Sequence, residues 1–117
     1  MNNELTRTQI VTKVAELASK NFGTTITEQD IKGRVRKREL IISRMACSIL
    51  LLKERHCTLQ SVGITLNRDH STIINHREQF KNCQNADDIF SRSLKRLMTK
   101  YVCPEFNTTL EELYSAY

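Results

Sequence analysis

Five consecutive polar residues, Arg68-Asp69-His70-Ser71-Thr72, combine several kinds of hydrogen-bonding chemistry. A guanidinium pairs with guanine or a phosphate, an imidazole offers one donor and one acceptor, and hydroxyls pair with most bases. The carboxylate accepts from a cytosine amine or caps a helix. A helix that enters the major groove end-on places its N-terminal side chains against base edges. These residues therefore fit a DNA-reading turn, and they fit equally a well-capped surface helix with a polar first turn.

The positive charge of the chain is concentrated in one stretch. Residues 32–44 hold six basic residues and one acidic residue, which equals the whole net charge of +5. Such concentration indicates a site for a polyanion more than a generally basic surface. Arg34, Arg36 and Arg38 alternate, so an extended chain points all three to one side, as suits a narrow minor groove. The alternative is a solvated loop that neutralises an acidic neighbour.

An enzyme site finds little support in these residues. Asp69, His70 and Ser71 are residue types of acid–base catalysis, but neighbours on one helix point in different directions and cannot form a relay. The chain has three glycines, spaced too far apart for a phosphate-binding loop of the form Gly-x-x-x-x-Gly-Lys-Ser/Thr. We therefore expect no enzyme activity, no nucleotide and no other cofactor.

The cysteines lack the paired spacing of a metal site or a redox motif. They are four in number: Cys47, Cys57, Cys83 and Cys103. In a reducing compartment we expect free thiols, some of them in the core. A zinc site built from His56, Cys57 and His70 is conceivable, but close pairs of ligands are absent, and we expect no metal.

Apolar residues at helical spacing predict the elements that position these groups. We expect helices over residues 8–22, 27–33, 39–55, 58–66, from 69 or 70 to at least 80, from 87 to Pro104, and 108–114. Thr27 with Asp30 resembles a capping box at the start of the second helix. The third helix is apolar nearly all round and should be the most buried. Pro104 is expected to end the sixth.

Two of these helices form a closely spaced pair. Thr58 is suited to cap a helix that continues to Leu66, and Asn67 and Arg68 form a tight turn before the next helix. Two short helices joined by a tight turn are the helix-turn-helix layout. The polar residues described first then lie at the start of the second helix of the pair.

Length and composition predict a single all-α domain of six to seven helices. The chain has 117 residues, which is one domain's worth, and few glycines or aromatic residues, which argues against a β-sandwich or barrel. We place the core at residues 8–100 and an acidic C-terminal extension at residues 101–117. The sequence has no membrane-spanning stretch and no signal peptide, so we expect a cytoplasmic protein, associated with the nucleoid.

The order of these motifs resembles the C-terminal DNA-binding domain of the bacterial chromosomal replication initiator DnaA. In that family a helix with an Arg-Gln pair precedes a Ser-Leu-x-x-Ile-Gly helix, then a turn and Arg-Asp-His-Thr-Thr-Val. Here the corresponding segments read Thr58-Leu59-Gln60-Ser61-Val62-Gly63 and Arg68-Asp69-His70-Ser71-Thr72-Ile73. The resemblance covers residues 8–100 and implies domain IV, a helix-turn-helix of the Trp-repressor kind.

The resemblance also implies roles for individual residues. The recognition helix of the family reads the major groove of a short asymmetric box with residues that match Asp69, His70, Ser71 and Thr72. An arginine of the basic loop, which matches Arg36, enters the neighbouring minor groove. Arg44 matches an arginine that contacts phosphate and bases at the start of the long helix, and the resemblance implies backbone contacts for Lys53 and Arg68. From the basic stretch itself we expect further phosphate contacts by Arg34 and Arg38. Met45 stands where the family usually has Gln, and His76 where it tends to have a small residue.

The resemblance implies double-stranded DNA as the partner, bound by a monomer that lacks the initiator's ATPase module. Replication initiation or its regulation is the expected setting. Two alternatives of other kinds remain. One is an interaction module derived from an initiator domain, which binds other replication proteins, for instance through the acidic C-terminal segment. The other is a transcriptional regulator.

Overall fold

Helix α3 (Arg38–Glu54) lies at the centre of the fold and is apolar on nearly all sides. Several of its side chains have no exposed surface: Ile42, Met45, Ala46, Ile49, Leu50 and Leu51. A helix that is hydrophobic all round must be surrounded by other elements. The prediction that this is the most buried helix is confirmed.

The computed structural model describes residues 5–54 and 57–117, and these residues form an all-α domain. The other elements around α3 are α1 (Arg7–Phe22), α2 (Glu28–Lys32), α4 (Leu59–Leu66), α5 (His70–Cys83), α6 (Ile89–Leu97), the π-helix η1 (Met98–Val102), α7 (Cys103–Glu105) and α8 (Leu110–Ser115). The predicted all-α class is thereby confirmed. Within the described ranges, no helix is long and apolar enough to cross a membrane.

Local capping explains where several helices begin and end. The Thr27 hydroxyl accepts from the Asp30 amide at 3.1 Å, and the Asp30 carboxylate accepts from the Thr27 amide at 2.9 Å. This is the predicted capping box, and it is confirmed. Helix α1 ends at Gly23, whose φ of 69° lies in the left-handed region that glycine adopts without strain. These local contacts fix the two ends of the segment between α1 and α2.

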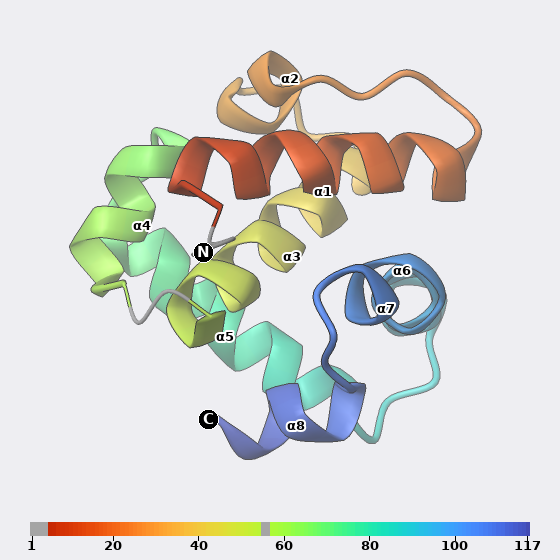
Figure 1. Ribbon diagram of the computed structural model, residues 1–117. Coiled ribbons are helices and arrows are strands. Elements are labelled where there is room, and N and C mark those ends of the chain that lie inside the picture. The colour runs from red at the N-terminus through yellow and green to blue at the C-terminus, as the bar shows by residue number, and fades with distance from the viewer. Residues whose placement is uncertain (1–4, 55–56) are drawn as a thin grey trace.

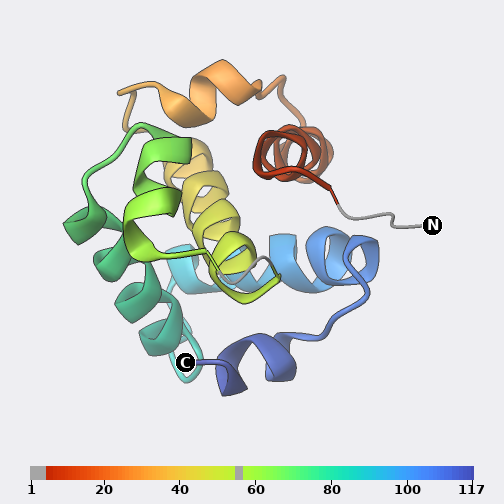
Figure 2. The same ribbon diagram turned by 60° about the vertical axis from the view of Figure 1, so that its left-hand side comes forward.

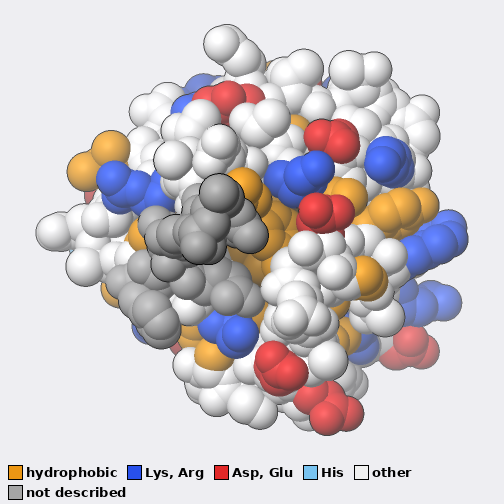
Figure 3. Space-filling model, in the orientation of Figure 1, with side chains coloured by type: hydrophobic (Ala, Val, Ile, Leu, Met, Phe, Trp, Pro, Cys, Tyr) orange, Lys and Arg blue, Asp and Glu red, His pale blue; other side chains and the backbone are white. Residues whose placement is uncertain are grey.

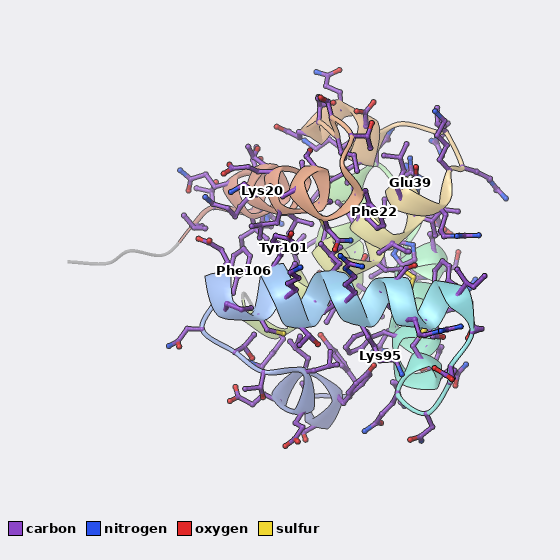
Figure 4. The ribbon with its side chains drawn as sticks, turned by 90° about the vertical axis from the view of Figure 1, so that its right-hand side faces the viewer. Lys20, Phe22, Glu39, Lys95, Tyr101 and Phe106 are labelled. Atoms are coloured by element: carbon purple, nitrogen blue, oxygen red, sulfur yellow. The ribbon has the colours of Figure 1, made fainter. Side chains whose placement is uncertain are left out.

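The helix predicted from residue 87 to Pro104 extends to Glu105, one residue beyond the proline that was expected to end it. Helix α6 begins after its N-cap Asp88 and continues without a break through η1 and α7, so that Pro104 lies inside the helical run. The Cys103 amide donates to the Met98 carbonyl, one residue further back than in an α-helix. Pro104 then occupies the first turn of α7, where a proline is tolerated. Figure 4 shows this run passing below α1, with Tyr101 and Phe106 on the side towards α1.

The C-terminal segment packs on the core. Leu113 in α8 is fully buried, and the Tyr114 ring stacks on Phe80 of α5 with 4.4 Å between the ring centroids. The Tyr117 hydroxyl donates to the Ile49 carbonyl of α3 at 2.7 Å. Helix α8 therefore closes the core over α3 and α5 at the end opposite α2 (Figure 1).

Candidate nucleic-acid interface

The turn between α4 and α5 is held tightly against the backbone of α4. Asn67 has φ 58° and ψ 47°, a left-handed conformation that asparagine tolerates better than most residues. The Arg68 amide donates to the Gly63 carbonyl at 2.7 Å. A Cβ atom on Gly63 would lie 2.5 Å from the Arg68 carbonyl oxygen. The predicted tight turn is confirmed, and Gly63 is what allows the turn to approach so closely.

The first turn of α5 presents its polar side chains to solvent. The side chain of His70 is 51% exposed and that of Asp69 is 71% exposed. Asp69 occupies the N-cap position, but its carboxylate accepts from the Ser71 hydroxyl at 2.5 Å instead of capping the backbone. This hydrogen bond, together with the nearby His70, lowers the pKa of Asp69. The turn therefore displays an ionised carboxylate, an imidazole and a hydroxyl side by side.

Arg44 and Arg68 hold the basic loop, residues 33–37, in place. The Arg44 guanidinium donates to the carbonyls of Ile31 at 2.7 Å, Asp30 at 2.9 Å and Gly33 at 3.1 Å. The Arg68 guanidinium donates to the carbonyls of Lys32 and Gly33 from the α4–α5 turn. Figure 2 shows the segment between α2 and α3 beside that turn. The two arginines thus fix the start of the basic loop next to the start of α5.

The charges of these arginines are weakly compensated by the protein itself. Arg44 is 4% exposed, and burial followed by the charge of Arg68 lowers its pKa. Burial, then the charges of Arg34 and Arg36, lower the pKa of Arg68. Within residues 5–54 and 57–117, no carboxylate forms an ion pair with any of these four arginines, although Asp30 acts on Arg44 from a distance. By contrast, acidic and basic side chains are interspersed on the face in Figure 3.

A pocket of about 280 Å³ lies between the basic loop and α5. We name it the arginine pocket, and its lining residues are Arg34, Arg36, Ile41, Arg44, Arg68, Thr72, Asn75, His76 and Gln79. The loop supplies two of the four arginines, α3 one and the α4–α5 turn one. The structure therefore brings five of the predicted site residues to one concave surface.

His76 lies in the middle of α5, on the side that packs against α3. It is 7% exposed, and its Nδ1 lies 2.7 Å from the Ser48 hydroxyl oxygen, which in turn donates to the Arg44 carbonyl at 3.1 Å. Burial, then the charges of Arg68 and Arg44, lower the pKa of His76 to about 4. The imidazole is therefore neutral at pH 7. The small Ser48 on α3 is what makes room for a histidine at this position.

Not every predicted site residue belongs to this surface. Arg38 is exposed at the first residue of α3, and Asp69, His70 and Ser71 lie on the neighbouring turn. Lys53 lies fifteen residues along α3 from Arg38, about 22 Å at 1.5 Å per residue, and lines a separate hollow with α8. The structure thus separates Lys53 from the other predicted phosphate contacts.

The tentative zinc site has no support in the described residues. His56 lies outside them, and among those that the structure describes no three His, Cys, Asp or Glu residues are placed to hold a metal ion. The four cysteines are free, and Cys47, Cys83 and Cys103 are buried. Burial raises the pKa of the Cys103 thiol to about 11, with a smaller contribution from Glu112.

Sequence reasoning missed four residues of the arginine pocket: the apolar Ile41 and the polar residues Asn75, His76 and Gln79. The signal was present, because Thr72, Asn75, His76 and Gln79 follow Arg68 at helical spacing on one face of α5. Without the basic loop beside it, however, a polar face on a helix has the same pattern as an ordinary solvated face.

Comparison with curated proteins finds a similarity to the chromosomal replication initiator protein DnaA of Oleidesulfovibrio alaskensis. The two sequences are 36% identical over 52 residues. The match covers 44% of this chain and 11% of the initiator. No family model matches the sequence, and no solved structure matches the fold. The similarity supports a DnaA-related origin.

Proposed function

We propose that this chain is a sequence-specific reader of double-stranded DNA, with α4 and α5 as a helix-turn-helix of the DnaA domain IV type. One observation carries the proposal. The exposed first turn of α5 and the basic loop lie side by side, because Arg68 of the turn donates to the carbonyls of Lys32 and Gly33. A recognition helix and a basic arm held in register can occupy neighbouring grooves of one duplex.

Base reading is assigned to two groups of residues. In the major groove the readers are Asp69, His70, Ser71 and Thr72, and in the minor groove the reader is Arg36. All but Thr72 are exposed, as a base contact requires. The similarity to a replication initiator favours sites of the DnaA-box kind and a role in replication initiation or its regulation. This assignment implies that one monomer binds each asymmetric site.

Phosphate contacts are assigned to Arg34 and Arg38, with Lys53 as a more distant contact. Arg44 and Arg68 add positive charge, but both donate hydrogen bonds to backbone carbonyls of α2 and of Gly33, so we assign them to holding the loop. Contacts to phosphates release counterions, and each one lowers log K by roughly 0.9 per unit of log salt concentration. Binding should therefore weaken steeply as salt rises.

A competition shift assay with two variants tests this assignment. His70→Ala removes an exposed base-reading group, and we expect the preference for a site of the DnaA-box kind over scrambled DNA to fall by about tenfold or more. Arg38→Ala removes an exposed phosphate contact, and both DNAs should then bind more weakly by a similar factor. Full discrimination retained by His70→Ala would contradict the proposed function.

A further inference from the structure

The arginine pocket lies where a DNA strand has to pass if the proposed function holds. A major groove and the adjacent minor groove are separated by one sugar-phosphate strand. The start of α5 and the basic loop are the two proposed readers, and the pocket is lined by both. The sugar-phosphate strand that separates the two grooves must then lie over the mouth of this pocket.

We propose that the arginine pocket is a phosphate site, which seats one phosphodiester of the strand between the two grooves through Arg34, Asn75 and Gln79. This inference rests on the proposed function for the source of the phosphate, which is DNA. The preference of the pocket for a phosphate group is argued from the pocket's own residues. Nothing in the resemblance or in the sequence similarity assigns a role to Asn75 or Gln79.

The fixed charges of the pocket favour an anion. Arg44 and Arg68 both donate to the Gly33 carbonyl, so their guanidinium groups are held in place before any ligand arrives. Each guanidinium is partly desolvated and carries the repulsion of neighbouring arginines, which lowers its pKa. A phosphate group in the pocket relieves that repulsion, and the groups need no reorganisation to receive it.

The neutral groups of the pocket supply hydrogen bonds with direction. Asn75 and Gln79 are exposed on successive turns of α5, and their side-chain amides are donors for phosphate oxygens. His76 adds no charge, because burial holds its pKa near 4. The volume of about 280 Å³ is far above that needed for a single water, so a phosphate group fits with its hydration.

Neutral linkages in the duplex test the site directly. A single methylphosphonate is moved along both strands of a duplex with a site of the DnaA-box kind, and binding is measured at each position. For the unmodified chain we expect one linkage between the two contacted grooves to weaken binding by about tenfold. In the variant with Arg34→Ala, Asn75→Ala and Gln79→Ala, the same linkage should weaken binding by about twofold or less, because the three proposed contacts to it are already lost.

Gln84→Ala is the matched control, because Gln84 is exposed at the opposite end of α5 and does not line the pocket. This variant should keep the full sensitivity to that linkage. If the triple variant keeps it as well, no phosphodiester lies in the arginine pocket and the proposal is overturned.

A second measurement separates this proposal from the proposed function. Inorganic phosphate is titrated into the full chain at constant ionic strength, and the side-chain amide signals of Asn75 and Gln79 are followed by NMR. Saturable shifts there, absent at Gln84 and absent with chloride, support a phosphate site even if the chain binds no duplex, in which case only the DNA source fails. If neither the linkage effect nor saturable shifts occur, the pocket is not a phosphate site.

Discussion

Gly63→Ala is a sharp test of the helix-pair geometry, because two effects of known size act in opposite directions. In an ordinary helix interior, alanine in place of glycine stabilises by about 1 kcal/mol. Here the new Cβ would lie 2.5 Å from the carbonyl oxygen of Arg68. That oxygen belongs to the backbone of the turn, so it cannot move away as the tip of a flexible side chain does.

The expected size of the effect follows from this contact. Restoring an ordinary separation of about 3.4 Å requires the turn to move by roughly 0.9 Å, and overpacking of this kind costs about 1–3 kcal/mol. The movement also disturbs the 2.7 Å hydrogen bond from the Arg68 amide to the Gly63 carbonyl, which is worth about 1 kcal/mol. We therefore expect a net loss of about 2 kcal/mol in the free energy of unfolding.

Urea unfolding of Gly63→Ala measures this loss, and Ile64→Ala is the neighbouring control. Ile64 is 81% exposed, so its truncation should change the free energy of unfolding by less than about 0.5 kcal/mol. A Gly63→Ala protein as stable as the unmodified chain, or more stable, would refute the close approach of the turn to α4.

Three further predictions concern buried groups. Burial lowers the pKa of His76 from 6.5 to about 4, so the stability that the neutral imidazole contributes above pH 6.5 is lost as the pH falls. Between pH 7 and pH 5 the free energy of unfolding should fall by about 2 kcal/mol. Urea unfolding at a series of pH values measures this loss, and a His76→Gln variant should lack it. Arg44→Lys should lower the free energy of unfolding by about 2 kcal/mol or more, because an ammonium cannot reproduce the guanidinium's hydrogen bonds to the carbonyls of Asp30, Ile31 and Gly33. Arg38→Lys at an exposed position should change it by less than about 0.5 kcal/mol, and equal effects of the two substitutions would exclude the buried role of Arg44. Cys57 should react with a thiol reagent in the native protein, whereas Cys47 should react only on unfolding, because full burial raises its pKa and shields it from the reagent. Peptide mapping that finds both cysteines labelled at similar rates would contradict the buried position of Cys47.

Features governed by near neighbours were predictable from the sequence. The capping box of Thr27 and Asp30, the cap at Thr58 and the turn at Asn67 each depend on contacts within a few residues, and all three are present. The burial of α3 followed from its apolar composition alone. Local periodicity and capping therefore sufficed for the all-α class and for most helix boundaries.

Features that depend on distant partners were not predictable in the same way. Arg44 belongs to a basic stretch, and its burial follows from carbonyl groups 11 to 14 residues earlier that only the folded chain brings to it. His76 is accommodated by Ser48, which is 28 residues away. Pro104 is accepted because the π-helix before it shifts the hydrogen-bond register. Helical periodicity contains no information on any of these contacts.

The central claim is that this chain reads a DNA sequence, and selection of bound duplexes from a random pool tests it most directly. The account predicts enrichment of one short asymmetric site at moderate salt, with weaker enrichment after His70→Ala. A pool that stays random through successive rounds of selection, or one that converges on a palindrome, would contradict a monomeric sequence-specific reader.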